Sequence, residues 1–500
     1  MLAKKVSLPK SSEQKFAFDV FIYGLTQVFV GLKGLFVLPV IAKILGATKY
    51  GIWSQVMVTI SLLSPILTLR LEMASVRYLA AKGEKEVRGE FFSMLGMIWL
   101  ATMTALGIIF FLGQQISLLL FNDRNLVAYV ELIAVLLIVR VNYIFLTNYY
   151  RTFNQIRKYS LIQAITNIFE MGLLALLIIY MRWGLSEALI ALITTEIAIS
   201  IVIFIHIVKK IGFSIKLNFK KLFPYLKYSL PLIPNAALYW VIDSSDRYVI
   251  GHFLGLSSVG IYSASYSLAR LITFFSSPIS FVLFPTISKL WGQKEYSSMK
   301  KYCEKSVKYY LLFAIPAVFG ICCMSPNILR LLTTKEFITS RTLILFISLG
   351  MFFVGLYQIY LYIIHLKEQT KYLPIIFLVV ALFNLGLNFL LIPKWGIIGA
   401  AFSTFLSYAL QFTAIFFLSM KFFPFSFDFS CFFKSLLASV IMFLVIKRFD
   451  PESLGVLVGV AFVGAAVYFA VLVLIKGVGL REWHLAISLI KKSPNNLGGN

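Results

Sequence analysis

Three cationic side chains lie deep inside long apolar stretches of this sequence, where a charge is costly. They are Lys33, Arg140 and Arg270. Insertion scales assign about 2.5 to 3.5 kcal/mol to a charged group at the centre of a membrane, so such residues normally face an interior cavity or a partner. A guanidinium offers paired donors to phosphate oxygens, which suits an anionic headgroup. These residues indicate a site for a phosphate-linked sugar inside the membrane.

Arg270 is the clearest case, because its neighbours at helical spacing are polar or aromatic. The same helix face carries Tyr262, Tyr266, Thr273 and Ser277, and tyrosine rings offer stacking faces to sugars. Similar stripes accompany Arg140 and the segment that holds Arg247, which is expected to pair locally or to reach the outer surface. The candidate cavity residues are Arg270, Arg140, Lys33, Tyr266, Tyr262, Asp243, Asp246 and Arg247.

Two acidic residues inside apolar stretches, Glu170 and Glu196, leave alternatives open. They could neutralise Arg270 or Arg140 in ion pairs that merely hold helices together. They could instead bind a coupling proton or sodium ion, as intramembrane carboxylates do in transporters. One sequence does not separate these interpretations, so both residues are candidates for ion coupling.

The elements that must position these residues are membrane-spanning helices. Of the 500 residues, 60% are hydrophobic and only 13% are charged, which predicts an all-α polytopic membrane protein with about fourteen spans. The expected spans are 18–43, 50–70, 91–113, 126–149, 160–181, 185–208, 228–252, 258–285, 306–326, 341–364, 372–392, 396–420, 432–449 and 453–475. Prolines inside several spans predict kinked helices that line a cavity.

The distribution of basic residues predicts the orientation of these spans. With the amino terminus inside, and with basic residues at the ends of spans counted with the adjoining loop, 32 of the 46 Lys and Arg residues fall in inner segments and 10 in outer loops. Both termini are therefore expected in the cytoplasm, and the first helix is expected to be retained rather than cleaved. The net charge of +25 is explained by this asymmetry and does not require a nucleic-acid partner. The four cysteines lack metal-ligand spacing and predict no disulfide framework.

An internal repeat divides the chain. Residues 45–54 recur as residues 254–263, and residues 183–188 recur as residues 395–400. Because the repeat contains six spans, its halves have the same orientation, as in transporters whose site lies between two lobes. The predicted domains are a six-helix lobe at 1–208, a basic amphipathic cytoplasmic linker at 209–227, a second lobe at 228–420, and two extra helices with a cytoplasmic tail at 421–500.

Signatures of catalysis are absent from the sequence. It has no phosphate-binding Gly-rich loop, no HExxH and no GxSxG, and its four histidines are scattered. The longest outer connection, at 327–340, is short for a glycan polymerase or ligase that works on the outer face. We therefore expect a transporter rather than an enzyme, with no metal and no cofactor beyond a coupling H+ or Na+.

Several stretches resemble the polysaccharide transporter family, which includes Wzx-type O-antigen flippases, within the multidrug/oligosaccharidyl-lipid/polysaccharide flippase superfamily. The motifs are SLPLIP at 229–234, DSSDRY at 243–248, LG at 254–255 with GIYS at 260–263, and FPTISK at 284–289. The resemblance covers nearly the whole chain and implies two six-helix lobes that move an undecaprenyl-diphosphate-linked oligosaccharide outward by alternating access. It also places Arg270 where related lipid II flippases have a cavity arginine.

The resemblance also narrows the cargo. The second-helix arginine of the lipid II flippases has no equivalent in 59–63, which makes lipid II itself a less favoured cargo. The drug-exporting branch has a carboxylate-centred site in its first helix, whereas this chain has Lys33 there, which favours an anionic cargo.

The leading hypothesis is a flippase for the repeat unit of O-antigen, capsule or exopolysaccharide in the bacterial cytoplasmic membrane. A glycan polymerase and chain-length machinery are its possible partners, besides the lipid-linked oligosaccharide and the bilayer. The alternatives are a cation-coupled multidrug antiporter of the same fold and a membrane glycan polymerase or ligase.

Overall fold

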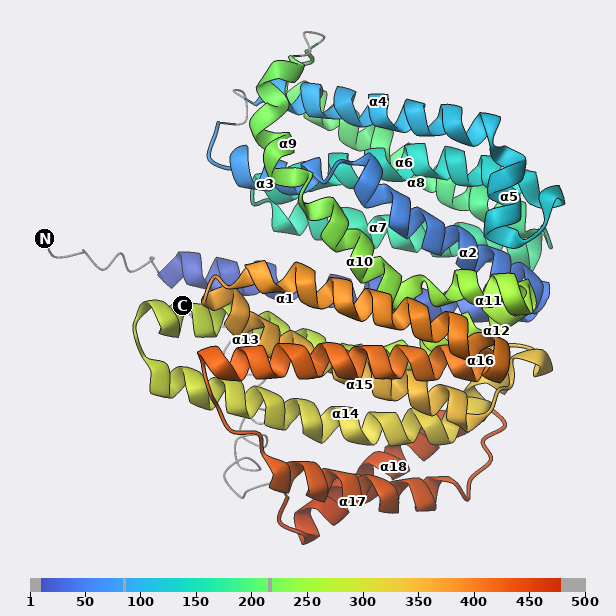
Figure 1. The fold of residues 1–500 in the computed structure, drawn as a ribbon, viewed down its shortest axis with the longest axis vertical. Coiled ribbons are helices and arrows are strands. Elements are labelled where there is room, and N and C mark those ends of the chain that lie inside the picture. The colour runs from blue at the N-terminus through green and yellow to red at the C-terminus, as the bar shows by residue number, and fades with distance from the viewer. Residues whose placement is uncertain (1–9, 84–86, 215–217, 478–500) are drawn as a thin grey trace, which may run out of the picture. The chain divides into compact units, whose positions relative to one another are not determined.

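The structure is a computed structural model that describes residues 10–83, 87–214 and 218–477. Within these ranges all regular elements are helices (Figure 1). The α-helices are α1 (Lys10–Val37), α2 (Lys43–Leu67), α3 (Leu71–Tyr78), α4 (Arg88–Phe111), α5 (Gly113–Phe121), α6 (Val127–Thr152), α7 (Ile156–Ala175), α8 (Leu185–Ile211), α9 (Phe223–Ser229), α10 (Leu232–Ser244), α11 (Asp246–Leu254), α12 (Leu256–Ala269), α13 (Thr273–Gly292), α14 (Tyr296–Leu332), α15 (Arg341–Leu366), α16 (Leu373–Phe422), α17 (Phe429–Ile446) and α18 (Leu454–Leu474).

The described residues contain 11 helical runs that are long and apolar enough to cross a membrane. This confirms the predicted class, an all-α polytopic membrane protein. Three runs, of 46, 73 and 53 residues, are long enough for at least two crossings of roughly 20 residues each. They are interrupted at Gly46, Gly255 and Gly396, where φ is 82°, 80° and 61°. Glycine adopts these angles without the steric penalty of a Cβ atom, so each run can turn there. The exact number of fourteen spans stays a prediction.

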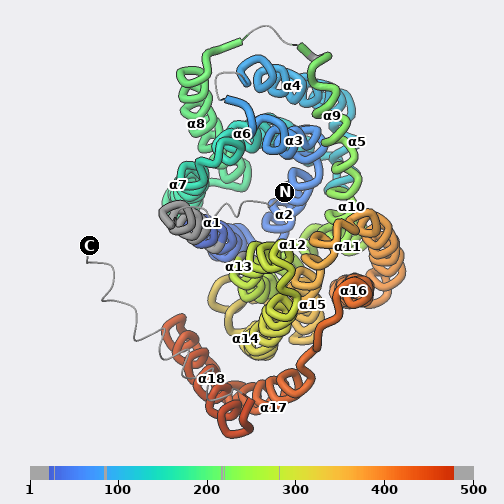
Figure 2. Tube along the Cα trace, turned by 90° about the vertical axis from the view of Figure 1, so that its left-hand side faces the viewer, coloured from blue at the N-terminus to red at the C-terminus, as the bar shows by residue number. Residues whose placement is uncertain are grey.

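The chain forms two compact units, which we describe separately. Unit 1 comprises Met1–Leu268, Leu332–Thr339 and Thr370–Gln411, and unit 2 comprises Ala269–Leu331, Ser340–Gln369 and Phe412–Asn500. In unit 1, α6 packs against α8, α2 and α4, and α1 packs against α7. In unit 2, α13 packs against α15, and α17 against α18 (Figure 2). The predicted boundaries at 208, 228 and 420 stay predictions.

Within unit 1, the two copies of the sequence repeat pack against each other with matching contacts. A Cβ atom on Gly51 would lie 1.8 Å from the carbonyl oxygen of Leu256, and one on Gly260 would lie 2.1 Å from that of Ala47. The hydroxyls of Ser54 and Ser263, which are 209 positions apart like the two glycines, are 2.6 Å apart. Helix backbones approach this closely only where side chains are absent or small. The repeat is thus a local pseudo-two-fold contact as well as a sequence pattern.

The predicted basic linker forms short helical pieces, apart from Lys216, which lies outside the described residues. After α8, a 3-10 turn at Phe219–Leu222 leads into α9, which packs against α3. Lys82, in the connection before α4, donates a hydrogen bond to Glu90 at 2.7 Å, and this contact raises the pKa of the Lys82 amino group. The same carboxylate accepts a hydrogen bond from Tyr225 of α9. Helix α9 is therefore tied to the amino-terminal end of α4 and to the connection that follows α3.

The last two helices have a defined place in unit 2. Buried residues of α17 and α18, such as Met442 and Tyr468, share an apolar cluster with Leu312 and Cys323 of α14. The Tyr468 hydroxyl donates a hydrogen bond to the carbonyl oxygen of Leu312 at 2.8 Å. All four cysteines are buried. The residues after 477, which include most of the predicted cytoplasmic tail, lie outside the described ranges.

Candidate functional site

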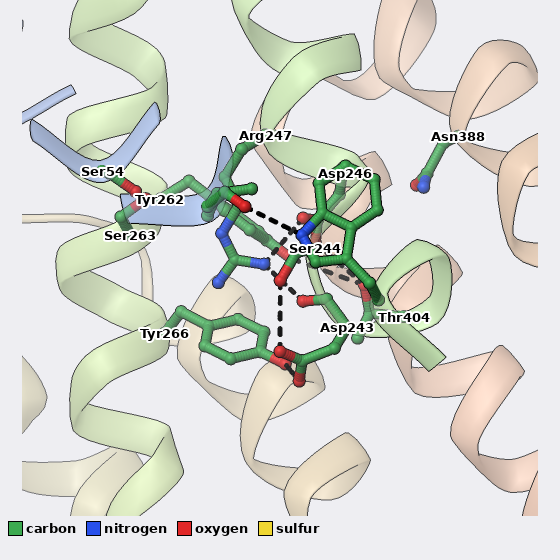
Figure 3. Close-up of polar contacts among 12 residues, drawn as sticks. Ser54, Asp243, Ser244, Asp246, Arg247, Tyr262, Ser263, Tyr266, Asn388 and Thr404 are labelled. Carbon is green, nitrogen blue, oxygen red and sulfur yellow. Dashed lines mark hydrogen bonds and ion pairs between the residues drawn. The ribbon is translucent and has the colours of Figure 1, made fainter. Parts of the chain in front are cut away.

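A buried ion pair lies at the start of α11. Asp246 is 1% exposed and Arg247 is 6% exposed, and Nη1 of Arg247 lies 2.8 Å from Oδ1 of Asp246. The other carboxylate oxygen accepts hydrogen bonds from the hydroxyls of Tyr262, at 2.5 Å, and Thr404, at 3.3 Å (Figure 3). The contacts join α11 to α12 and α16. They satisfy charges whose burial alone would cost several kcal/mol each.

A second carboxylate, Asp243 of α10, extends this network. Its Oδ1 atom accepts hydrogen bonds from the hydroxyls of Tyr266 at 2.9 Å and Tyr408 at 3.0 Å. The Arg247 guanidinium lies 4.1 Å from the centre of the Tyr266 ring, within cation–π range. We call this set of residues the carboxylate–tyrosine network; it consists of Asp243, Asp246, Arg247, Tyr262, Tyr266, Thr404 and Tyr408.

The carboxylate–tyrosine network contains five of the candidate residues from the sequence. Its hydrogen bonds and ion pair determine the direction in which their side chains point. Tyr262 and Tyr266 are 0% and 2% exposed, with their hydroxyls on the carboxylates. Arg247 is paired locally with Asp246, one of the two expectations for it. The network contains two carboxyl groups, Asp243 and Asp246, and one guanidinium, Arg247. Direct contact of these residues with cargo stays a prediction.

The sequence analysis missed the contribution of α16. Asn384 donates a hydrogen bond to Ser407 at 3.0 Å, and Asn388 donates one to Asn384 at 3.0 Å. Thr404 and Tyr408, one turn apart, reach the two carboxylates. The sequence contains a signal for these contacts. Two asparagines four positions apart, Asn384 and Asn388, lie inside an apolar run, and hydroxyl residues at spacings of three and four follow at 403–408.

A second set of charges lies among the first helices of unit 1. Lys33 of α1 forms an ion pair with Glu170 of α7, and Nη2 of Arg140 on α6 lies 2.5 Å from Oε1 of Glu196 on α8. The contact between Arg140 and Glu196 is an ion pair without a well-directed hydrogen bond. Neither carboxylate oxygen of Glu196 accepts a hydrogen bond from the described residues. Glu170 and Glu196 also interact with each other. These four residues form what we call the amino-terminal network.

The amino-terminal network has its cations on the outside and its acids on the inside. The side chains of Lys33 and Arg140 keep 19% and 25% of their surface accessible, whereas Glu170 and Glu196 keep 3% and 0%. The pairing that the sequence left open for Arg140 is therefore present. The accessible cationic faces still permit an anionic ligand, and both roles stay predictions.

Arg270 lies at the junction of two α-helices rather than inside one. It opens a 3-10 turn, Arg270–Ile272, between α12 and α13, and it belongs to unit 2. The residue is exposed. The sequence pattern places residues 266 and 270 on one face of a continuous α-helix. In the structure, the α-helix ends at Ala269 and the 3-10 turn begins at Arg270. Its role in binding cargo stays a prediction.

Metal ligation has no support among the described residues, where no group of three or more His, Cys, Asp or Glu side chains could hold a metal ion. The oxygen atoms of the carboxylate–tyrosine network are engaged with one another and with Arg247. Its chemistry is that of charge compensation and hydrogen bonding.

Replacing Asp246 by Ala is expected to destabilise the protein by about 3 kcal/mol, because it leaves the buried Arg247 guanidinium without its carboxylate. Thermal unfolding in detergent, followed by size-exclusion chromatography, measures the loss. The double variant Asp246→Asn, Arg247→Gln removes both charges and should recover much of the stability. A single variant that melts with the parent protein would contradict the structural importance of this pair.

The eleven apolar helical runs among the described residues define a multi-pass membrane protein. Residues 40–342 match the family described as "Polysaccharide biosynthesis protein", and because the match spans more than half of the chain, the chain belongs to this family. The resemblance found in the sequence is thereby confirmed.

Relatives and solved structures agree with this membership. Two proteins of Haloferax volcanii are similar: the "Probable low-salt glycan biosynthesis flippase Agl15", 27% identical over 48% of this chain and 46% of its own length, and the "Probable flippase AglR", 26% identical over 46% and 51%. The chain thus spans about half the length of each. The lipid II flippase MurJ, solved in an inward closed conformation, has a TM-score of 0.75 at 21% identity, covering 90% of this chain and 98% of that one. This likeness establishes the fold.

Proposed function

We propose that this protein is a flippase that moves an undecaprenyl-diphosphate-linked oligosaccharide from the inner to the outer leaflet of the cytoplasmic membrane. The observation that carries the proposal is the presence of accessible cations, Lys33 and Arg140, within spans of a chain from a polysaccharide biosynthesis family. The names of the similar flippases support the same activity. The cargo would be a repeat unit of O-antigen, capsule or exopolysaccharide, and a polymerase with its chain-length machinery would receive it.

The transport mechanism follows from the cost of moving a diphosphate through an apolar core. Cationic side chains offset that cost by supplying hydrogen bonds and opposite charge in place of water. Lys33, Arg140 and Arg270 would supply them, and alternating access would expose the site to each leaflet in turn. We place both termini in the cytoplasm. The contact between Gly51 and Gly260 then lies at the outer ends of α2 and α12, where it would close the outer side.

Coupling to an ion is part of this proposal. Glu170 and Glu196 are buried carboxyl groups within spans, and the carboxylate–tyrosine network contains two more carboxyl groups. Either could bind H+ or Na+ during the transport cycle. A cation-coupled multidrug antiporter is the second candidate, since a multidrug resistance transporter of the MATE family shares the fold with a TM-score of 0.64.

Depleting the protein from cells is expected to raise the level of one lipid-diphosphate oligosaccharide several-fold, because its inner-leaflet pool is no longer emptied. Mass spectrometry of polyprenyl-linked lipids measures this pool and gives the mass of the cargo. Re-expression of the parent gene should restore the original level. An unchanged lipid pool together with greater retention of cationic dyes would overturn the flippase proposal in favour of the drug antiporter.

A further inference from the structure

The amino-terminal network has a charge arrangement that links ligand binding to proton binding. Its two cations and two carboxylates, all ionised, sum to zero. The network can therefore rest in a low-dielectric environment without net charge, which is the condition under which buried ionic groups are tolerated. An arriving anion changes this balance, because it competes with the carboxylates for the same two cations.

The order of burial determines which groups an anion meets first. Lys33 and Arg140 retain 19% and 25% of their side-chain surface, while Glu170 and Glu196 lie behind them at 3% and 0%. A phosphate group can therefore contact surface of the two cations, whereas the two carboxylates present almost no surface. The accessible side chains can turn toward the phosphate, since long cationic side chains have several rotamers.

Once the cations turn toward a phosphate, the two carboxylates lose their partners. They are buried next to each other, and two adjacent carboxylates in an apolar setting cannot both stay ionised. Tyr143 on α6 also interacts with both carboxylates, and its hydroxyl donates a hydrogen bond to Thr166 on α7 at 3.1 Å. Neither supplies positive charge. Protons are therefore the available compensation.

We propose that the amino-terminal network exchanges partners: the diphosphate of the lipid-linked cargo takes Lys33 and Arg140, and Glu170 and Glu196 take up protons in the same step. This inference rests on the proposed function and adds the coupling to it. The loaded network, with two cations, a dianionic headgroup and two neutral acids, is again uncharged. The headgroup and the protons bind cooperatively, so the cargo is carried as an electroneutral unit.

Proton uptake on binding tests the exchange directly. Calorimetric titration of the full-length protein in lipid nanodiscs with a polyprenyl diphosphate, in two buffers of different ionisation enthalpy, counts the protons absorbed. We expect about one proton for each carboxyl group, and an affinity that falls roughly tenfold per pH unit for each linked proton as the pH rises. Inorganic diphosphate, titrated in parallel, shows whether the headgroup alone suffices or the lipid is required.

Variants identify the groups that take up the protons. Each of Glu170→Gln and Glu196→Gln should lower the uptake by about one proton relative to the parent, and the double variant should leave only the titration of the ligand. Glu187→Gln, which removes an acid from the same helix as Glu196, is the matched control and should behave as the parent. The double variant Lys33→Met, Glu170→Gln removes one complete ion pair and leaves the net charge unchanged. If a single variant does not fold, proton uptake is measured with this double variant instead.

The possible outcomes separate this inference from the proposed function. Binding of the polyprenyl diphosphate with the same proton uptake in the parent and in the Gln variants would overturn the exchange and leave the flippase proposal standing. No binding of the polyprenyl diphosphate by a folded parent protein would contradict the proposed cargo itself.

Discussion

Replacing Gly51 by Ala is expected to abolish most transport, and Gly260→Ala should do the same. A Cβ atom at either position lies within 2.1 Å of a backbone carbonyl oxygen on the facing helix, so the backbones of α2 and α12 must separate. Overpacking of this kind costs about 2 kcal/mol, which lowers the population of the contact roughly 30-fold. If the contact closes the outer side, the cycle loses its inward-facing state, and surface glycan measures that loss.

The state of the contact can be followed separately from transport. Cysteines in place of Ser54 and Ser263, whose hydroxyls lie 2.6 Å apart, should cross-link on oxidation. Adding Gly51→Ala should lower the cross-linking yield. Gly107→Ala is the matched control, because a Cβ atom there meets no heavy atom within 4 Å. Equal export and equal cross-linking in the Gly51→Ala and Gly107→Ala proteins would refute the role of the contact.

Loss of Arg270 is expected to be the second severe defect. Removing the guanidinium with Arg270→Ala should abolish export of the glycan. A charge-assisted hydrogen bond to phosphate contributes about 2 to 3 kcal/mol where water is partly excluded, and its loss corresponds to roughly 30- to 150-fold. Arg270→Lys keeps the charge without the planar pair of donors and should give an intermediate phenotype.

Export of surface glycan in cells, normalised to the amount of protein in the membrane, measures the effect of Arg270. Arg124 is a suitable control because it is likewise exposed and likewise opens a 3-10 turn, Arg124–Leu126. Arg124→Ala should therefore export normally. Normal surface glycan in a well-expressed Arg270→Ala strain would remove this residue from the binding site.

Comparison of prediction with structure shows which inferences a single sequence supports. The repeat predicted from residues 45–54 and 254–263 has matching geometry, since Gly46 and Gly255 share φ angles near 80°. Turn residues and their glycines are local features, and local features are visible in a sequence. The second repeat match is less exact, because Gly396 has a positive φ and Gly184, its counterpart, does not.

The pairing of charges was less predictable. The sequence marked Glu170 and Glu196 as possible partners of Arg140 or Arg270, and the structure pairs Arg140 with Glu196 and Lys33 with Glu170. Which acid faces which base depends on the rotation of each helix about its axis and on which helices are neighbours. A hydropathy pattern specifies neither the rotation of a helix nor its neighbours. Because the four residues lie on four different helices, their pairing could not be predicted from it.

The sequence by itself determined the membrane class, the apolar helices, the internal repeat and the family. Each of these follows from composition, from the length of apolar runs or from motifs that are contiguous in the chain. Only the tertiary structure decided that α16 brings Thr404 and Tyr408 to Asp246 and Asp243, and that accessible cations cover buried acids in the amino-terminal network. These contacts join residues 56 to 165 positions apart, and the packing of helices in three dimensions is what brings such residues together.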